Sequence, residues 1–197
     1  MSPCKSLRQR LRDDRTLAIV VALCWLAHAL AHVRDHSTHE LYWACNVSAL
    51  AIALGLTMRW HSVTSAATLW LVAGTPLWLL DLAGGGAFLP TSLLTHGVVL
   101  SLSIARLRRV GIAQESWWMA LLGGALLQQI SRWMTHWRHN VNVSWGIYPV
   151  ARGWFANYPR YWIASFALMG AIYALLTYAI TRWHQRTQPH RKTPAES

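Results

Sequence analysis

Charged side chains are scarce in this sequence, and acidic ones are the scarcest. Only 13% of the 197 residues are charged, with 7 Asp and Glu against 18 Lys and Arg, while 54% are hydrophobic. A soluble domain carries about a quarter charged residues, so the composition argues against one. It is typical of a chain that places most of its length in a lipid bilayer.

Cysteine is also rare. The three cysteines, Cys4, Cys24 and Cys45, form no CxxC pair. Their number and spacing exclude a disulfide framework and a zinc finger.

The net charge of +11 would suit a nucleic-acid-binding protein, but its distribution does not. Lys and Arg stand at the ends of apolar runs, whereas a nucleic-acid surface gathers them in one patch. The sequence has 13 Trp residues, a residue type that favours the membrane–water interface. We therefore expect the lipid bilayer, with its anionic headgroups, as the partner, and no nucleic acid.

Six apolar runs reach or approach the length of about 20 residues that crosses a bilayer. They predict an all-α, polytopic membrane bundle of six transmembrane helices in a single domain (17–183). A basic cytoplasmic tail (1–16) precedes it, a cytoplasmic tail (184–197) follows it, and an outer loop covers 135–160. The predicted spans are 17–33, 41–58, 63–82, 91–107, 117–134 and 161–183.

The distribution of Lys and Arg predicts the orientation. With the N-terminus inside, 13 of the 18 fall on the cytoplasmic side, so the positive-inside rule places both termini in the cytoplasm. One alternative concerns the first run, which is short, follows a basic region and ends in Ala29-Leu30-Ala31, similar to a signal-peptidase site. Cleavage there would leave five spans and remove His28 without changing the orientation of the rest.

Two spans contain residues that alter helix packing. Pro76 should kink the span 63–82. Gly123-Gly124 would let a neighbouring helix approach the span 117–134 closely.

Several polar residues fall at one depth in the outer half of the predicted bundle. From the helical rise, His28 lies about 7 Å below the outer surface, Cys45 and Asn46 about 6–8 Å, and His96 about 7–8 Å. Polar groups at such a depth usually face the bundle interior or a water-filled cavity. Cys45 is either a small buried side chain or a nucleophile, and His96 is either an interhelical hydrogen-bond partner or its base.

The outer rim offers groups that suit a polar headgroup. Asp81 and Arg132 stand there and could pair with each other. The aromatic segment 140–162 is either an interfacial belt or a lid. As a lid, it would use Asn140, Asn142 and Arg152 to reach a headgroup.

Seven of the ten histidines fall on the outer side. His28, His32 and His36 follow an i, i+4, i+8 spacing that would line one face of a continued helix. A helix end exposed to water at the membrane interface explains this pattern without a ligand. Imidazole is also the commonest metal ligand, so a metal or haem site is an alternative, built from these three or from His28, His32 and His96.

Three short motifs resemble those of a known family. ELYWACNVSAL at 40–50 looks like the Cys motif of YwaF-type integral membrane proteins. LTHGVV at 94–99 resembles that family's Ser-His-Gly segment, and NVN at 140–142 is similar to its Asn-rich loop. The resemblance covers about residues 40–145, with one departure, since Trp43-Ala44-Cys45 stands where the family has His-Leu-Cys.

Related animal transmembrane proteins include a lipid acyltransferase that uses a Cys and a His, which map onto Cys45 and His96. The resemblance implies a lipid-handling acyl-transfer enzyme of the bacterial inner (plasma) membrane with a phospholipid substrate. Cys45 would be the nucleophile and His96 its general base. The expected substrate-binding residues are Asn46, Asp81, Arg132, Asn140, Asn142 and Arg152. The alternatives are a haem- or metal-binding protein and a non-enzymatic assembly subunit; cofactor and protein partners stay open.

Overall fold

The computed structural model describes residues 7–187, apart from the side chains of residues 7–12 and 150. Within that range every regular element is a helix and no strand occurs, which confirms the all-α prediction. The basic residues Lys5, Arg191 and Lys192, which the orientation argument counts, lie outside the described residues.

Each of the six apolar runs falls on a helical segment. The α-helices are α1 (Leu7–Arg34), α2 (Ala44–Thr57), α3 (His61–Ala83), α4 (Leu100–Val110), α5 (Ser116–Met134) and α6 (Tyr158–Thr187). α1 starts well before the predicted span, because a helix keeps its hydrogen bonds internal and can continue from the bilayer into water. Part of the expected tail 1–16 is therefore helical.

Shorter helical turns complete the chain. The 3-10 turn η1 (Thr38–Tyr42) precedes α2, and the π-helical η2 (Leu94–Val99) runs directly into α4. The loop between α5 and α6 contains η3 (Trp137–His139), η4 (Val141–Val143) and η5 (Pro149–Ala151). π-Helical turns cost hydrogen-bond geometry and are often found at functional sites.

Three stretches within residues 7–187 are long and apolar enough to cross a membrane: Asp13–Arg34, His61–Ala83 and Tyr158–Thr187. α2 is apolar but has only 14 residues. Large apolar side chains point outward from α6, among them Leu168 at 61% and Leu175 at 67% exposed. Such an apolar exterior is compatible with a surface in contact with lipid.

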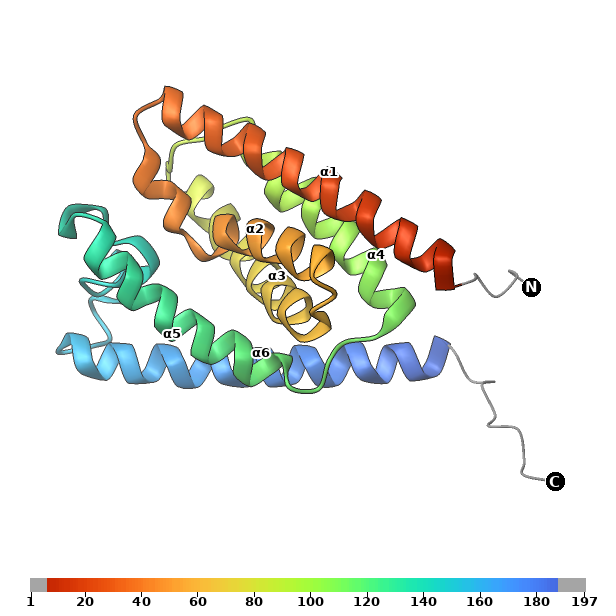
Figure 1. The fold of residues 1–197 in the computed structure, drawn as a ribbon. Helices are drawn as coiled ribbons and strands as arrows, with labels where there is room; N and C mark the ends of the chain where they lie inside the picture. Colours follow the sequence, from red (N-terminus) through yellow and green to blue (C-terminus); the bar gives the residue numbers. More distant parts are fainter. Residues whose placement is uncertain (1–6, 188–197) are drawn as a thin grey trace.

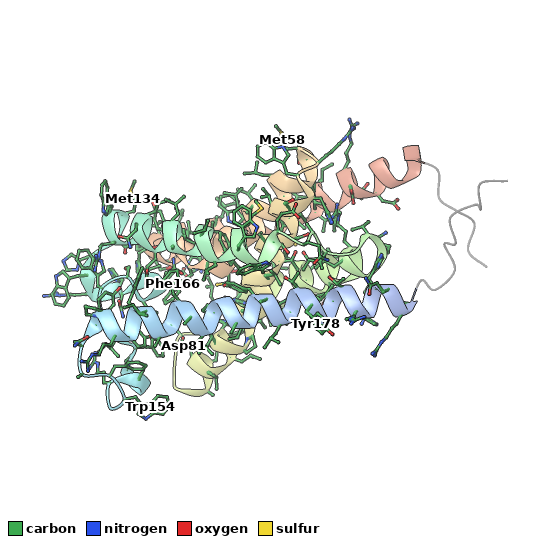
Figure 2. The ribbon with its side chains drawn as sticks, turned by 90° about the horizontal axis from the view of Figure 1, so that it is seen from below. Met58, Asp81, Met134, Trp154, Phe166 and Tyr178 are labelled. Atoms are coloured by element: carbon green, nitrogen blue, oxygen red, sulfur yellow. The ribbon has the colours of Figure 1, made fainter. Side chains whose placement is uncertain are left out.

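The helices form three neighbouring groups. Figure 1 shows α1 lying along η2 and α4, with α2 and α3 between this group and the pair α5 and α6. Figure 2 shows α6 running along one face of the bundle beside α5.

Ion pairs and hydrogen bonds gather several helix ends at one end of the bundle, called here the Asp14 end. Asp14 near the start of α1 forms a bidentate ion pair with Arg106 near the end of α4, at 3.0 and 3.2 Å. Gln114, just before α5, donates to Thr181 near the end of α6 at 3.0 Å. The beginnings of α1 and α5 therefore lie with the ends of α4 and α6.

The opposite end, called here the His32 end, gathers the other helix ends. His32 near the end of α1 contacts Ser37 before η1, with 2.8 Å between Nδ1 and Oγ. The hydroxyl of Tyr148, in the loop before α6, donates to Asp81 near the end of α3 at 3.0 Å. Successive helices thus alternate in direction along the bundle.

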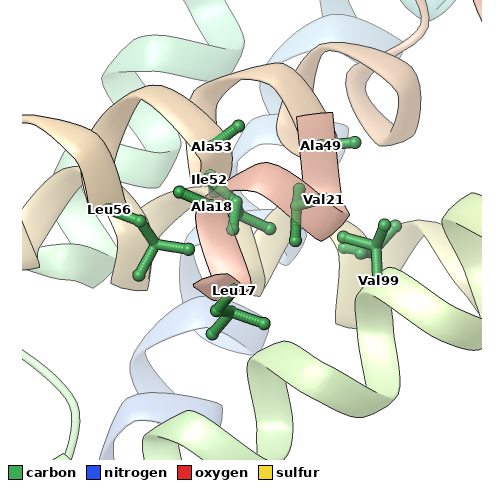
Figure 3. Close-up of a cluster of buried hydrophobic side chains, with 10 residues drawn as sticks. Leu17, Ala18, Val21, Ala49, Ile52, Ala53, Leu56 and Val99 are labelled. Carbon is green, nitrogen blue, oxygen red and sulfur yellow. The ribbon is translucent and has the colours of Figure 1, made fainter. Parts of the chain in front are cut away.

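Two clusters of mostly small and aliphatic side chains hold the helices together. In the first (Figure 3), Leu17 and Val21 of α1 pack with Ile52 and Leu56 of α2 and Val99 of η2. The buried members of the second are Ala66, Leu69, Leu107, Ile112, Ala120 and Tyr173. The close van der Waals packing of these side chains joins the helices to one another.

Gly123 of α5 lies against α3, on the indole of Trp70. A Cβ at Gly123 would come within 2.7 Å of Cζ2 of Trp70, so only glycine permits this approach. The Trp70 Nε1 donates to the carbonyl oxygen of Ala120 at 2.7 Å. Pro76 lies inside α3 without ending it.

Candidate functional site

The polar residues that the sequence places at one depth meet near the His32 end. Nε2 of His28 lies 3.1 Å from Nε2 of His32, one turn later on α1. The two residues are 1% and 7% exposed. His28 also reaches Asn46 (Nε2 to Oδ1, 3.1 Å) and Thr91 (Nδ1 to Oγ1, 2.9 Å).

The hydrogen-bond pattern around these residues places their protons. Asn46 Nδ2 donates to the carbonyl oxygen of Glu40 at 2.8 Å, so its Oδ1 must accept from Nε2–H of His28. His28 then accepts a hydroxyl proton at Nδ1. His32 donates from Nδ1 to Oγ of Ser37, so the single Nε2–H proton of His28 is shared between Oδ1 of Asn46 and Nε2 of His32. Every ring nitrogen of both neutral imidazoles has a partner, and the network is closed.

His96, on η2, is held differently. Thr75 donates its only hydroxyl proton to the carbonyl oxygen of Leu71 at 2.8 Å, so its Oγ1 accepts the Nδ1–H of His96 at 3.0 Å. The Trp78 ring stacks on the imidazole, with centroids 4.3 Å apart and planes at 3°. Nε2 of His96 is thereby left with its lone pair, and no described residue hydrogen-bonds to it. A general base requires an imidazole in this form.

Cys45 packs on the same part of α3 that holds His96. Its Cβ lies 3.6 Å from the position a Cβ would take on Gly74. The thiol sulfur is 4.0 Å from Oδ1 of Asn46, and none of the hydrogen bonds among the described residues joins it to His96. Both expected catalytic residues therefore lie against the same segment of α3, but no hydrogen bond among the described residues joins them.

Two expected headgroup ligands instead hold the loop in place. Asn142 accepts the backbone N–H of Ala44 at 2.9 Å and donates to the carbonyl oxygen of Tyr42 at 2.6 Å and to Ser131 Oγ at 2.8 Å. Asn140 accepts the backbone N–H groups five and six residues later, each at 2.9 Å. Their φ angles of 51° and 44° are left-handed, a region that Asn visits more readily than most residues.

The remaining headgroup candidates lie apart. Asp81 accepts the Tyr148 hydroxyl; burial raises the pKa of Tyr148, and the bond to Asp81 raises it further. Arg132 donates from Nε to the carbonyl oxygen of Ser144 at 3.0 Å. The Asp81–Arg132 pair therefore does not form within the described structure, because the loop engages both groups. Arg152 is exposed.

His36 departs from the face shared by His28 and His32. α1 ends at Arg34, and His36 adopts a left-handed φ of 53° in an exposed turn. Within residues 7–187, no group of three or more His, Cys, Asp or Glu side chains is arranged to hold a metal ion.

Sequence reasoning missed the residues that orient the histidines. On α3, Thr75 stands directly before Pro76 and Trp78 two residues after it, and Thr91 precedes η2. The polar side chain of Thr75 within an apolar run was the one sequence feature that could have indicated its role. No sequence pattern, however, pairs this part of α3 with His96.

No protein-family model matches this chain, and no curated protein or solved structure matches it significantly.

Proposed function

We propose that this chain is a six-span protein of the bacterial inner membrane, with both termini in the cytoplasm, that transfers acyl groups from lipids. The alternating helix ends support six crossings, with the Asp14 end inside and the His32 end outside. α2 spans only about 21 Å at 1.5 Å per residue, a mismatch that local bilayer thinning accommodates. η2 and α4 form one continuous helical segment, Leu94–Val110.

The orientation of His96 carries the functional proposal. Its Nδ1–H is held by Thr75 and its ring by Trp78, while Nε2 has no partner among the described residues. A base held by a second group is the arrangement that activates a nucleophile. The resemblance of segments 40–50 and 94–99 to YwaF-type proteins supports the same pair, Cys45 and His96.

The proposed step balances as follows. The thiol proton of Cys45 moves to Nε2 of His96, and the sulfur attacks the ester carbonyl of a phospholipid. The C–O bond of the ester breaks, and the imidazolium returns the proton to the departing lysophospholipid alkoxide. A second lipid hydroxyl, or water, then takes the acyl group from the thioester.

The step requires one movement. The sulfur of Cys45 now lies 4.0 Å from Oδ1 of Asn46, and the step requires it to approach Nε2 of His96. Catalytic hydrogen bonds commonly tighten only when substrate is bound.

Acyl labelling tests the proposal. The purified chain is incubated with a phospholipid that carries a fluorescent acyl chain, and the hydroxylamine-sensitive adduct is measured. We expect Cys45→Ser to abolish the adduct and His96→Ala to slow its formation by about 10²-fold or more. Cys24→Ser and His36→Ala are the matched controls and should label like the wild type. Wild-type labelling in a folded Cys45→Ser or His96→Ala variant would overturn the proposal.

A non-enzymatic assembly subunit is the second candidate, and the closed network of His28, His32 and Asn46 favours it. Fully satisfied buried polar groups specify a unique packing and need no chemistry. This function predicts no acyl adduct in the wild type, together with a protein partner that copurifies and is lost on His28→Ala.

Haem or metal binding by His28, His32 and His96 has less support, because hydrogen bonds already occupy the ring nitrogens of His28 and His32. A visible absorption spectrum and metal analysis of the detergent-purified chain test it directly.

A further inference from the structure

A recess of about 340 Å³ lies between α5 and α6 at the His32 end. It is lined by Gln129, Arg132, Tyr158, Pro159 and Trp162. It is separate from the proposed acyl-transfer site, whose Cys45 and His96 belong to α2 and η2.

The guanidinium of Arg132 is held in a fixed orientation beside this recess. Its Nε donates to the carbonyl oxygen of Ser144 at 3.0 Å. Its Cζ atom lies 5.1 Å from the ring centroid of Trp145 and 5.8 Å from that of Tyr158. A guanidinium fixed through Nε presents its two terminal nitrogens as a planar fork.

This half-buried cation has no counter-ion in the described structure. No carboxylate of residues 7–187 lies within ion-pair distance of Arg132, and none of their hydrogen bonds uses its terminal nitrogens. A buried or half-buried charge is costly unless it is paired. The geometry of the recess therefore favours an anion as its ligand.

The other polar groups of the recess narrow the choice of ligand. The Tyr158 hydroxyl donates to the carbonyl oxygens of Val143 and Ser144, and Trp162 Nε1 donates to Gln128. Gln129 is exposed, and none of the described hydrogen bonds involves its amide. The free donors are thus the fork of Arg132 and the amide of Gln129, set between the apolar surfaces of Pro159 and Trp162.

We propose that Arg132 and Gln129 bind the phosphate oxyanion of an outer-leaflet phospholipid in this recess. Two parallel N–H donors match two oxygens of one phosphate. On the proposed topology the recess opens between two spans near the outer surface, where lipid phosphates lie. The site depends on that topology and is independent of catalysis by Cys45.

Binding to the purified full chain in neutral detergent tests the assignment. The probes are dioctanoyl phosphatidylglycerol, dioctanoylglycerol and inorganic phosphate, and dissociation constants are read by microscale thermophoresis. We expect the phosphatidylglycerol to bind at least about tenfold more tightly than the phosphate-free lipid. Arg132→Gln should weaken phosphatidylglycerol binding at least about tenfold, because it removes charge-assisted hydrogen bonds.

Two further variants keep the test decisive. Gln129→Ala removes a side chain without a protein partner, so the fold stays intact and affinity should fall about threefold. It decides the question if Arg132→Gln fails to fold. Arg34→Gln removes a cation at the end of α1 whose side chain is 88% exposed, and it should leave affinity unchanged.

Three outcomes would overturn the assignment. The first is wild-type phosphatidylglycerol affinity in a folded Arg132→Gln variant or, where that variant does not fold, in Gln129→Ala. The second is equal binding of the two lipids. The third is Arg132-dependent binding of inorganic phosphate alone, which would identify a free anion as the ligand. Cys45→Ser should bind lipid normally, so this proposal and the acyl-transfer proposal can fail separately.

Discussion

Asn142 caps α2 from 98 positions away: its Oδ1 accepts the backbone N–H of Ala44 at 2.9 Å. The N-cap residue of α2 is Trp43, whose side chain makes no capping hydrogen bond. The first N–H groups of a helix lack partners within it, and a loop residue supplies one here. Through its bonds to Tyr42 and Ser131, Asn142 also ties the start of α2 to α5.

Asn142→Ala should therefore lower the free energy of unfolding by about 2 kcal/mol, because it removes a cap and leaves polar groups unsatisfied. Unfolding by SDS, followed by circular dichroism, measures the change. Asn157→Ala, which removes one exposed bond to the N–H of Arg160, should cost about 1 kcal/mol or less. Equal effects of the two substitutions would contradict the capping role.

His28→Ala should destabilise the chain far more than His36→Ala. The first removes a fully buried ring and takes one hydrogen-bond partner from each of Asn46, Thr91 and His32, at a cost of about 2–4 kcal/mol. His36 is exposed, and its loss should change stability by less than about 0.5 kcal/mol. Thermal unfolding in detergent compares the two variants. A similar melting temperature for both would show that the histidine network contributes little.

The Asp14–Arg106 pair should show a large coupling energy in a double-mutant cycle. Its side chains are 31% and 9% exposed, and breaking a largely buried bidentate pair leaves a charge uncompensated. We expect a coupling of about 1–3 kcal/mol from Asp14→Asn and Arg106→Gln. The Asp13–Arg109 pair, at 3.8 Å with Arg109 52% exposed, is the matched control and should give below about 1 kcal/mol.

Acidification should weaken the packing of η1 against the loop that follows α5. The rings of His39 and His139 stack with centroids 3.6 Å apart. The pKa of His139 is lowered first by partial desolvation and then by His39 and His136, while Glu40 acts in the opposite direction. Near pH 6 the unfolded chain then binds more protons than the folded chain. The contribution of His139 to stability is therefore complete above its ordinary pKa of about 6.5. It is lost as the pH falls through the lowered pKa.

The matching measurement follows the melting temperature between pH 7.5 and pH 5. His139→Gln should flatten this dependence, whereas His36→Gln should preserve it. An unchanged slope in His139→Gln would assign the pH dependence to other groups.

Thr75 positions His96, so its hydroxyl should matter for acyl labelling. Thr75→Val removes the acceptor for Nδ1–H and should slow adduct formation about tenfold or more, since the tautomer is no longer held. Thr75→Ser keeps the oxygen and should restore most of the rate. A restored rate in Thr75→Ser would show that the hydroxyl positions His96, because this substitution removes only the methyl group.

The sequence by itself determined the helical class and the six apolar segments, because the length and composition of a bilayer-crossing helix are local properties. It also placed His28, Asn46, Cys45 and His96 at one depth, since depth follows from counting residues along a helix.

Only the tertiary structure decided what each polar group does. Asn142 and Arg132 both looked like headgroup ligands, yet Asn142 is used as a cap and Arg132 keeps a free fork. The three histidines near one level differ because Asn46 closes the network around His28 and His32, while Thr75 leaves Nε2 of His96 open. Hydrogen-bond partners come from helices distant in the chain, and the direction and order of those contacts depend on packing that no local pattern encodes.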